Sequence, residues 1–196
     1  MNTKEMIIKV AREEFILNGY QKASLRNIAS KCNITATALY RHFKDKEDIF
    51  QSVIKPFINE IEEMRSYIEE KDYDLLENNN VSEVWSFEGD NNFHFLLIFK
   101  GDKELVKLII RERRDWLRNY LSEYEVNTTL EYLSKMRELG LNVNKFDERA
   151  FKTIIDSYVD AYFNVLLMNL DDEESFKICK TISKFYTVGF RNLLGF

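Results

Sequence analysis

Turn-forming residues are scarce in this chain, whose 196 residues include only six glycines and one proline. A sandwich or barrel of short strands needs a turn after each strand, and Gly and Pro supply many of those turns. An all-β architecture is therefore excluded, and helices joined by a few connections remain. Hydrophobic residues make up 45% of the sequence, which is enough for one domain, or one domain with a small appendage, to bury a core.

Charge is distributed unevenly along the sequence. The net charge is -5, yet residues 1–56 carry ten Lys/Arg against six Asp/Glu, and the remainder carries 18 against 27. A basic segment followed by an acidic one is typical of a protein in which only the basic part meets a polyanion. The first fifty-odd residues are therefore the predicted nucleic-acid-binding part.

Several classes of protein are disfavoured by what the sequence lacks. Cys32 and Cys179 are far apart and in no Cys-x-x-Cys spacing, so we expect neither a disulfide framework nor a metal site. The longest apolar run is too short for a membrane span, and the charged N-terminus does not resemble a signal peptide, so a cytoplasmic location is predicted. Only two histidines, His42 and His94, occur, and there is no phosphate-binding loop or catalytic motif. We therefore expect no enzyme, no catalytic residues and no cofactor.

Helical spacing and capping residues predict two short helices after a first longer one. An apolar stripe from Ile7 to Phe15 predicts the first helix, which Gly19 can end in the left-handed conformation. Ser24 and Thr35 are placed to cap the second and third helices with their hydroxyl groups. The pattern indicates a helix-turn-helix.

The remaining sequence predicts longer helices with few breaks. Asp45 begins a fourth helix, and Pro56 within it predicts a kink. Residues 71–92 are rich in Asp, Asn and Gly and predict a connection, with a turn near 81–85. Further helical segments are expected at 93–100, at 102–139 as one helix or two abutting ones, at 148–169 after Asp147, and at 172–194 after Asp171.

The N-terminal segment resembles the DNA-binding domain of the TetR family of bacterial transcriptional regulators. The resemblance covers residues 7–50, about a quarter of the chain, and rests on an ordered series of motifs: Gly19-Tyr20, Ala23-Ser24-Leu25-Arg26-Asn27-Ile28-Ala29, Ile34-Thr35 and the run from Ala38 to Phe50. It implies that Thr35, Ala36, Thr37 and Tyr40 contact DNA bases or backbone. It also implies a homodimer.

The chemistry of DNA recognition selects an overlapping set of residues. The second helix of a helix-turn-helix lies in the major groove, so its exposed face carries short or polar side chains with phosphate donors at its ends. Ser24 and Lys46 lie at predicted helix starts, where free amides also favour an anion. The complete predicted DNA-binding set is Ser24, Arg26, Thr35, Ala36, Thr37, Tyr40, Arg41, His42, Lys44 and Lys46.

Each of these residues also has an ordinary structural interpretation. Ser24 and Thr35 act as helix caps in any case, and Lys44 and Lys46 are typical of a solvated turn. It is the ordered set on a basic segment that favours DNA binding. The run from Arg111 to Arg114 is typical of a solvated helix face. The alternative is that it contacts the DNA-binding head, by which we mean the predicted DNA-binding domain over residues 1–48.

The acidic part is predicted to dimerise and to bind an effector. Apolar residues at helical spacing run along both final helices: Phe151, Ile155, Tyr158, Tyr162 and Val165, then Ile178, Ile182, Phe185, Gly189 and Leu193. These stripes are wider than one monomer needs, which predicts a homodimer through residues 148–194. Aromatic side chains near Trp116, Tyr120, Tyr158 or Tyr162 could line an effector pocket, although the sequence identifies neither the ligand nor its site.

The prediction is thus an all-α protein with two domains: a three-helix helix-turn-helix DNA-binding domain over residues 1–48 and a helical regulatory bundle for ligand binding and dimerisation over 49–196. Its expected function is that of a repressor released from a palindromic double-stranded DNA operator by a small-molecule effector. The alternative is a helical protein–protein adaptor with a non-functional helix-turn-helix.

Overall fold

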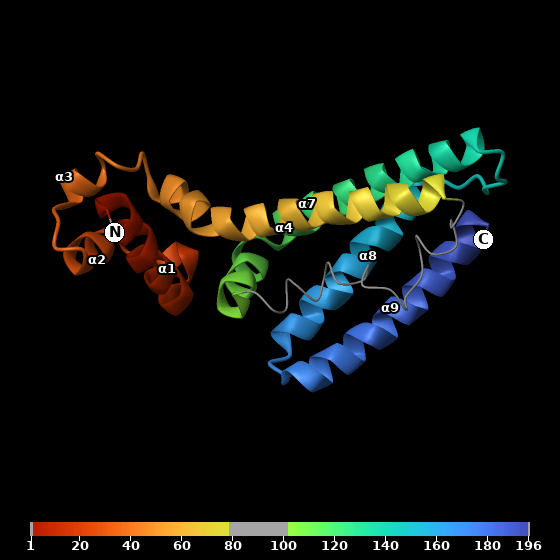
Figure 1. Ribbon diagram of the computed structural model, residues 1–196. Helices are drawn as coiled ribbons and strands as arrows, with labels where there is room; N and C mark the ends of the chain where they lie inside the picture. The colour runs from red at the N-terminus through yellow and green to blue at the C-terminus, as the bar shows by residue number, and fades with distance from the viewer. Residues whose placement is uncertain (1, 79–101, 196) are drawn as a thin grey trace. The chain divides into compact units, whose positions relative to one another are not determined.

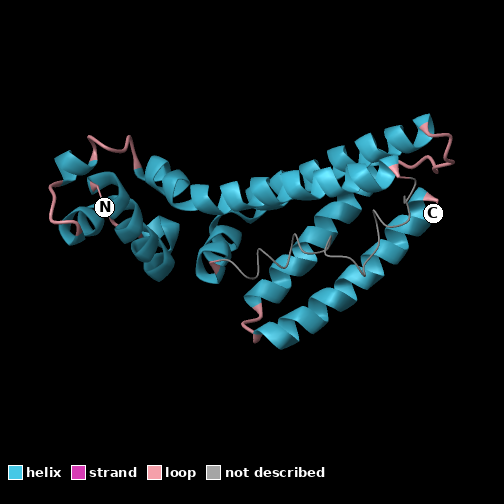
Figure 2. Cartoon of the chain, viewed as in Figure 1, coloured by secondary structure: helices cyan, strands magenta, loops and turns pink. Residues whose placement is uncertain are grey.

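The computed structural model describes residues 2–78 and 102–195 of the chain. All regular secondary structure in these residues is helical (Figures 1 and 2), which confirms the predicted fold class. The helices are α1 (Thr3–Lys22), α2 (Leu25–Lys31), α3 (Ala36–Leu39), α4 (Lys46–Glu77), α7 (Lys103–Glu138), α8 (Glu148–Leu167) and α9 (Asp172–Leu194). They form two compact units, and α4 and α7 each contribute to both.

The first unit contains the chain up to Glu62 and the beginning of α7 up to Arg113. In its core the ring of Phe15 meets the edge of Phe50, with centroids 5.4 Å apart. Ile28 of α2 and Leu39 of α3 are also completely buried. Burial of side chains of this size contributes about 1.5–3 kcal/mol each, so the short helices α2 and α3 are held by packing and not by their own length.

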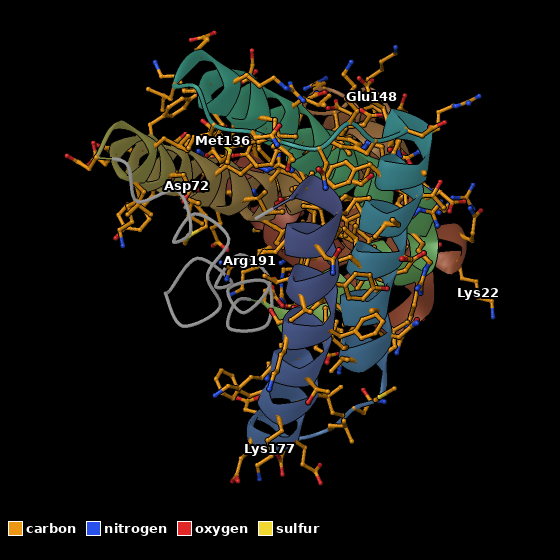
Figure 3. All side chains as sticks on the ribbon, turned by 90° about the vertical axis from the view of Figure 1, so that its right-hand side faces the viewer. Lys22, Asp72, Met136, Glu148, Lys177 and Arg191 are labelled. Atoms are coloured by element: carbon orange, nitrogen blue, oxygen red, sulfur yellow. The ribbon has the colours of Figure 1, made fainter. Side chains whose placement is uncertain are left out.

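The second unit contains the rest of α4 and the chain from Arg114 onward. Within it, α8 and α9 form an antiparallel pair, as the positions of Glu148, Lys177 and Arg191 in Figure 3 show. The aromatic ring of Tyr158 in α8 packs on that of Tyr186 in α9 at 4.9 Å between centroids. Aromatic contacts therefore join these two helices along their shared face.

Helix starts agree closely with the sequence prediction. Asp147 and Asp171 cap α8 and α9 by accepting hydrogen bonds from the backbone N–H groups of the first turn. Gly140, with φ of 80°, follows the end of α7 as predicted. α7 is also interrupted at Arg113, whose φ is -141°, so both descriptions of this segment, one helix or two abutting ones, apply in part.

The end of α4 differs from the prediction. The connection predicted to begin at residue 71 is wrong for residues 71–77, because α4 continues to Glu77. Leu76 is completely buried and Asp72 nearly so, and this packing outweighs the weak helix propensity of the Asp residues there. α4 also runs through Pro56 without ending. The predicted turn at 81–85 and helical segment at 93–100 lie outside the described residues.

No helix among the described residues is long and apolar enough to cross a membrane.

A shared carboxylate holds α7 to α8 in the second unit. Asp160 accepts from Arg114 Nε at 2.9 Å and from Arg118 Nη1 at 3.1 Å. We expect Asp160→Asn to lower the free energy of unfolding by about 2 kcal/mol, because both guanidinium groups lose their common anion. The matched control is Asp115→Asn, since that exposed carboxylate pairs only on the surface with Arg118 and its loss should cost less than about 0.5 kcal/mol. Equal losses in urea unfolding of the two variants would contradict this role for Asp160.

Candidate nucleic-acid interface

The start of α2 is fixed by a buried carboxylate. Glu14 of α1 is only 2% exposed. It accepts from Lys31 Nζ at 3.0 Å, from Asn18 Nδ2 at 3.0 Å, from the Ser24 N–H at 3.3 Å and from Asn27 Nδ2 at 3.4 Å. Burial alone would raise the pKa of Glu14, but the hydrogen bonds and the Lys31 charge outweigh it and hold this pKa below its ordinary value. Glu14 is therefore a carboxylate that ties α1 to α2.

The predicted caps of the two short helices are present. Ser24 Oγ accepts from the Asn27 N–H at 3.4 Å at the start of α2, and Thr35 Oγ1 accepts from the Ala38 N–H at 3.1 Å at the start of α3. Between the helices Asn33 takes a left-handed conformation with φ of 54°, which Asn tolerates better than most residues. This conformation produces the tight turn of the helix-turn-helix.

α3 turns one side inward and the other to solvent. Leu39 and Phe43, with 0% and 2% exposure, anchor it in the core. Most of the predicted contact residues on and around α3 are exposed: Thr35, Ala36, Thr37, Tyr40, Arg41, His42 and Lys44. No Asp or Glu occurs between residues 33 and 44. The structure therefore brings seven of the ten predicted residues to one short, exposed segment without negative charge.

The other three predicted residues flank this segment. Arg26 is exposed on α2, while Ser24 is half-buried at its start. Lys46 is half-buried at the start of α4, where its Nζ donates to the Gln21 carbonyl at 3.0 Å and lies 4.9 Å from the centre of the Tyr20 ring. Lys46 thus has a structural role in joining α1 to α4, which the sequence prediction did not include.

The beginning of α7 belongs to the same unit and contacts the helix-turn-helix region. Arg113 Nη2 donates to Glu47 Oε2 at 2.8 Å, and its guanidinium lies 4.6 Å from the centre of the Tyr20 ring. The Tyr20 N–H donates to Glu112 Oε1 at 3.2 Å. Gly19, with φ of 74°, permits this approach, because a Cβ there would lie 2.8 Å from the Glu112 carboxylate. Of the two interpretations of residues 111–114, contact with the head is therefore the one observed for Glu112 and Arg113.

Tyr20 and Glu47 shift each other's pKa in opposite directions. Burial raises the pKa of Tyr20, and the neighbouring Glu47 carboxylate raises it further. The pKa of Glu47 is lowered, since hydrogen bonds from Gln51, Tyr20 and Arg113 outweigh the effect of burial. A further ion pair in the first unit, between Arg12 and Asp102, joins α1 to the residue before α7. These pairs were missed by sequence reasoning because their partners are far apart in the chain.

Among the described residues, no group of three or more His, Cys, Asp and Glu side chains is arranged to hold a metal ion.

Comparison with known proteins identifies relatives of this interface. Residues 7–53 match the model of the family described as bacterial regulatory proteins, tetR family. Over 52 residues the chain is 42% identical to the HTH-type transcriptional repressor BepR of Brucella suis, a match covering 26% of this chain and 25% of that protein. The chain thus spans about a quarter of the length of the first curated relatives it matches.

Longer similarities are weaker in sequence. The chain is 22% identical over 187 residues to a protein of Escherichia coli named as a probable acrEF/envCD operon repressor, a match that covers 90% of this chain and 81% of that one. Among solved structures, a TetR-family transcriptional regulator of Pectobacterium atrosepticum aligns with a TM-score of 0.54 at 18% identity over 99% of this chain and 95% of the other. A Mesorhizobium loti protein assigned to the same family gives 0.58 at 21% identity over 99% and 97%. These structures share the fold.

The buried position of Glu14 gives a measurable expectation. We expect Glu14→Gln to lower the free energy of unfolding at neutral pH by about 1–3 kcal/mol, because a neutral amide loses the charge-assisted bond from Lys31 and cannot accept from all four donors. Glu13→Gln is the matched control, since Glu13 is an exposed neighbour on the same helix.

The contribution of Glu14 to the free energy of unfolding should decrease as the pH falls. The pKa of Glu14 is lowered on folding from its ordinary value of 4.5, so its contribution is complete above that value and is lost as the pH falls through the folded pKa. The difference in unfolding free energy between the wild type and Glu14→Gln should therefore shrink in acid. A difference that is constant with pH, or absent at neutral pH, would show that the Glu14 charge does not stabilise the head.

Proposed function

Because residues 7–53 match the family model described as bacterial regulatory proteins, tetR family, we propose that this chain is a transcriptional repressor that binds an operator as a homodimer and is released by a small molecule. The observation that carries the proposal is the exposed segment around α3, which combines small side chains with Arg41, His42 and Lys44 and contains no acidic residue. Such a surface suits the major groove and its flanking phosphates. The DNA-binding domain is proposed to be residues 1–48, and the regulatory domain 49–196.

The ten residues proposed to contact DNA divide by chemistry. Ser24, Arg26, Tyr40, His42, Lys44 and Lys46 can donate to phosphate oxygens, while Thr35, Ala36 and Thr37 lie on or beside the exposed face of α3, where base edges would be. Arg41 follows the end of α3 and can serve either purpose. Lys46 has one donor engaged with the Gln21 carbonyl, so only part of its capacity remains for a phosphate.

The proposed dimer interface lies on one face of α9. The α8 residues of the predicted stripe, from Phe151 to Val165, are buried within the subunit and cannot form an interface. On α9, by contrast, Phe185 is 74% and Val188 61% exposed, and on α8 Ile154 is 37% exposed. Large exposed apolar side chains grouped on one helix face, unlike a single exposed one, are typical of a surface that a partner covers. We place the homodimer within residues 148–194, with this face of α9 at its centre.

Two symmetric heads fit a palindromic operator. A dimer with twofold symmetry presents two copies of α3, and these meet successive major grooves when they lie about 34 Å apart, one turn of DNA. The effector is proposed to act by changing that separation from the regulatory domain.

The phosphate contacts give the first test of DNA binding. We expect Lys44→Ala to weaken binding to all duplex sequences alike and to reduce the slope of log affinity against log salt by about 0.9 per subunit, because one phosphate contact is lost. Lys55→Ala, another exposed lysine of the same unit, is the control and should leave the slope unchanged. An unchanged slope for Lys44→Ala would remove this lysine from the interface, and no binding of the wild type to any duplex would favour the adaptor function instead.

The dimer interface can be tested separately. We expect Phe185→Asp to give monomers in sedimentation experiments, because an unpaired carboxylate would be buried at the centre of the proposed interface. Leu17→Asp is the control, since Leu17 is also exposed, at 76%, but lies in α1 outside that interface. An intact dimer for Phe185→Asp would place the subunit contact elsewhere.

A further inference from the structure

We infer that the recognition segment reads A·T base pairs through thymine methyl groups, with Ala36 and Thr37 as the residues that determine this specificity. The inference rests on the proposed function, since it names the base pairs that the proposed DNA-binding surface selects. It depends on which side chains α3 exposes and on which of their polar groups are already engaged.

The exposed face of α3 offers methyl groups and few donors. Ala36 and Thr37 are exposed, whereas Leu39 is buried and Ala38 is half-buried. The Thr35 hydroxyl is engaged at 3.1 Å with the Ala38 N–H as the helix cap. The outward groups of α3 are therefore the Ala36 methyl and the Thr37 methyl and hydroxyl.

These groups match one base better than the other three. Guanine presents two acceptors that are read by Arg or Lys, adenine is read by Asn or Gln, and cytosine presents a donor that is read by Asp or Glu. None of these six residue types occurs in α3 or at its cap, Thr35. Thymine presents a methyl group and one acceptor, which suit the Ala36 methyl and the two groups of Thr37.

In this inference the exposed residues beyond α3, Arg41 among them, contact phosphates and contribute affinity, while α3 itself determines specificity. Arg41, His42 and Lys44 are exposed beyond the end of α3, where they can hold phosphates of any sequence. With the chain positioned by these contacts, the small side chain of Ala36 lets the backbone of α3 approach the base edges closely. Thymine discrimination then comes from apolar contact, so each methyl–methyl contact should change affinity by about fourfold.

The test begins with selection of duplexes from a random DNA pool by the full chain at fixed salt. The inference predicts half-sites with A·T pairs at their centre. Each thymine in one half-site is then replaced by uracil, which removes only the C5 methyl group. We expect wild-type affinity to fall about fourfold at one or two positions.

Matched variants assign each contact. Ala36→Gly and Thr37→Ser remove one protein methyl group each, and Thr37→Ser keeps the hydroxyl group. The variant that lacks the contacting methyl group should bind the thymine and uracil duplexes with equal affinity. Lys44→Ala should weaken both duplexes and keep the fourfold ratio. Circular dichroism establishes that each variant is folded, and because the two substitutions are independent, one misfolded variant leaves the other to test the inference.

Three results would overturn the inference while leaving DNA binding intact. In the first, the wild type binds the thymine and uracil duplexes with equal affinity at every position. In the second, the selected half-sites have G·C pairs at their centre, and Arg41→Ala loses this preference. In the third, binding depends on salt but no sequence is selected. Failure to bind any duplex would instead remove the proposed function itself.

Discussion

The recognition surface depends on the burial of Leu39 and Phe43. A helix as short as α3 cannot form in water without tertiary contacts, because too few hydrogen bonds compensate for the ordered backbone. Leu39 is completely buried and Phe43 nearly so, and the Thr35 cap satisfies a free N–H of the first turn. These contacts fix which side chains of α3 face solvent, so the chemistry of the proposed DNA-binding surface follows from the packing beneath it.

A second layer of polar contacts holds the helices that support α3. Glu14 ties α1 to α2 through four donors, and Lys46 ties the end of α1 to the start of α4. The Glu112 and Arg113 contacts add the beginning of α7 to the same unit. α7 is interrupted at Arg113, and the next residue, Arg114, pairs with Asp160 in the second unit, so neighbouring arginines have partners in different units. The peptide bond between Arg113 and Arg114 thus links a residue that contacts the helix-turn-helix region to a residue paired within the second unit.

Local interactions explain what the sequence could predict. Ser24, Thr35, Asp147 and Asp171 cap helices through hydrogen bonds that span two or three residues, so their roles are visible in the sequence itself. Glu14 could also have been found, because it lies seven residues after Ile7, on the apolar stripe of α1 where a carboxylate needs partners. The pairs of Glu47 with Arg113 and of Arg12 with Asp102 could not, since nothing local specifies them. Nor does periodicity decide which apolar side chains of α9 face inward: Phe190 is buried there, whereas Phe185 is exposed.

Hydrogen exchange of the full chain with and without a short duplex measures directly whether the segment from Ser24 to Lys46 contacts DNA. At low salt even a duplex of unselected sequence should bind through phosphate contacts, so the experiment does not require the operator. The account predicts slower exchange in residues 24–46 with DNA, and no change in α8 and α9 where the proposed dimer is already formed. Unchanged exchange in residues 24–46 under conditions where the duplex is bound would contradict it.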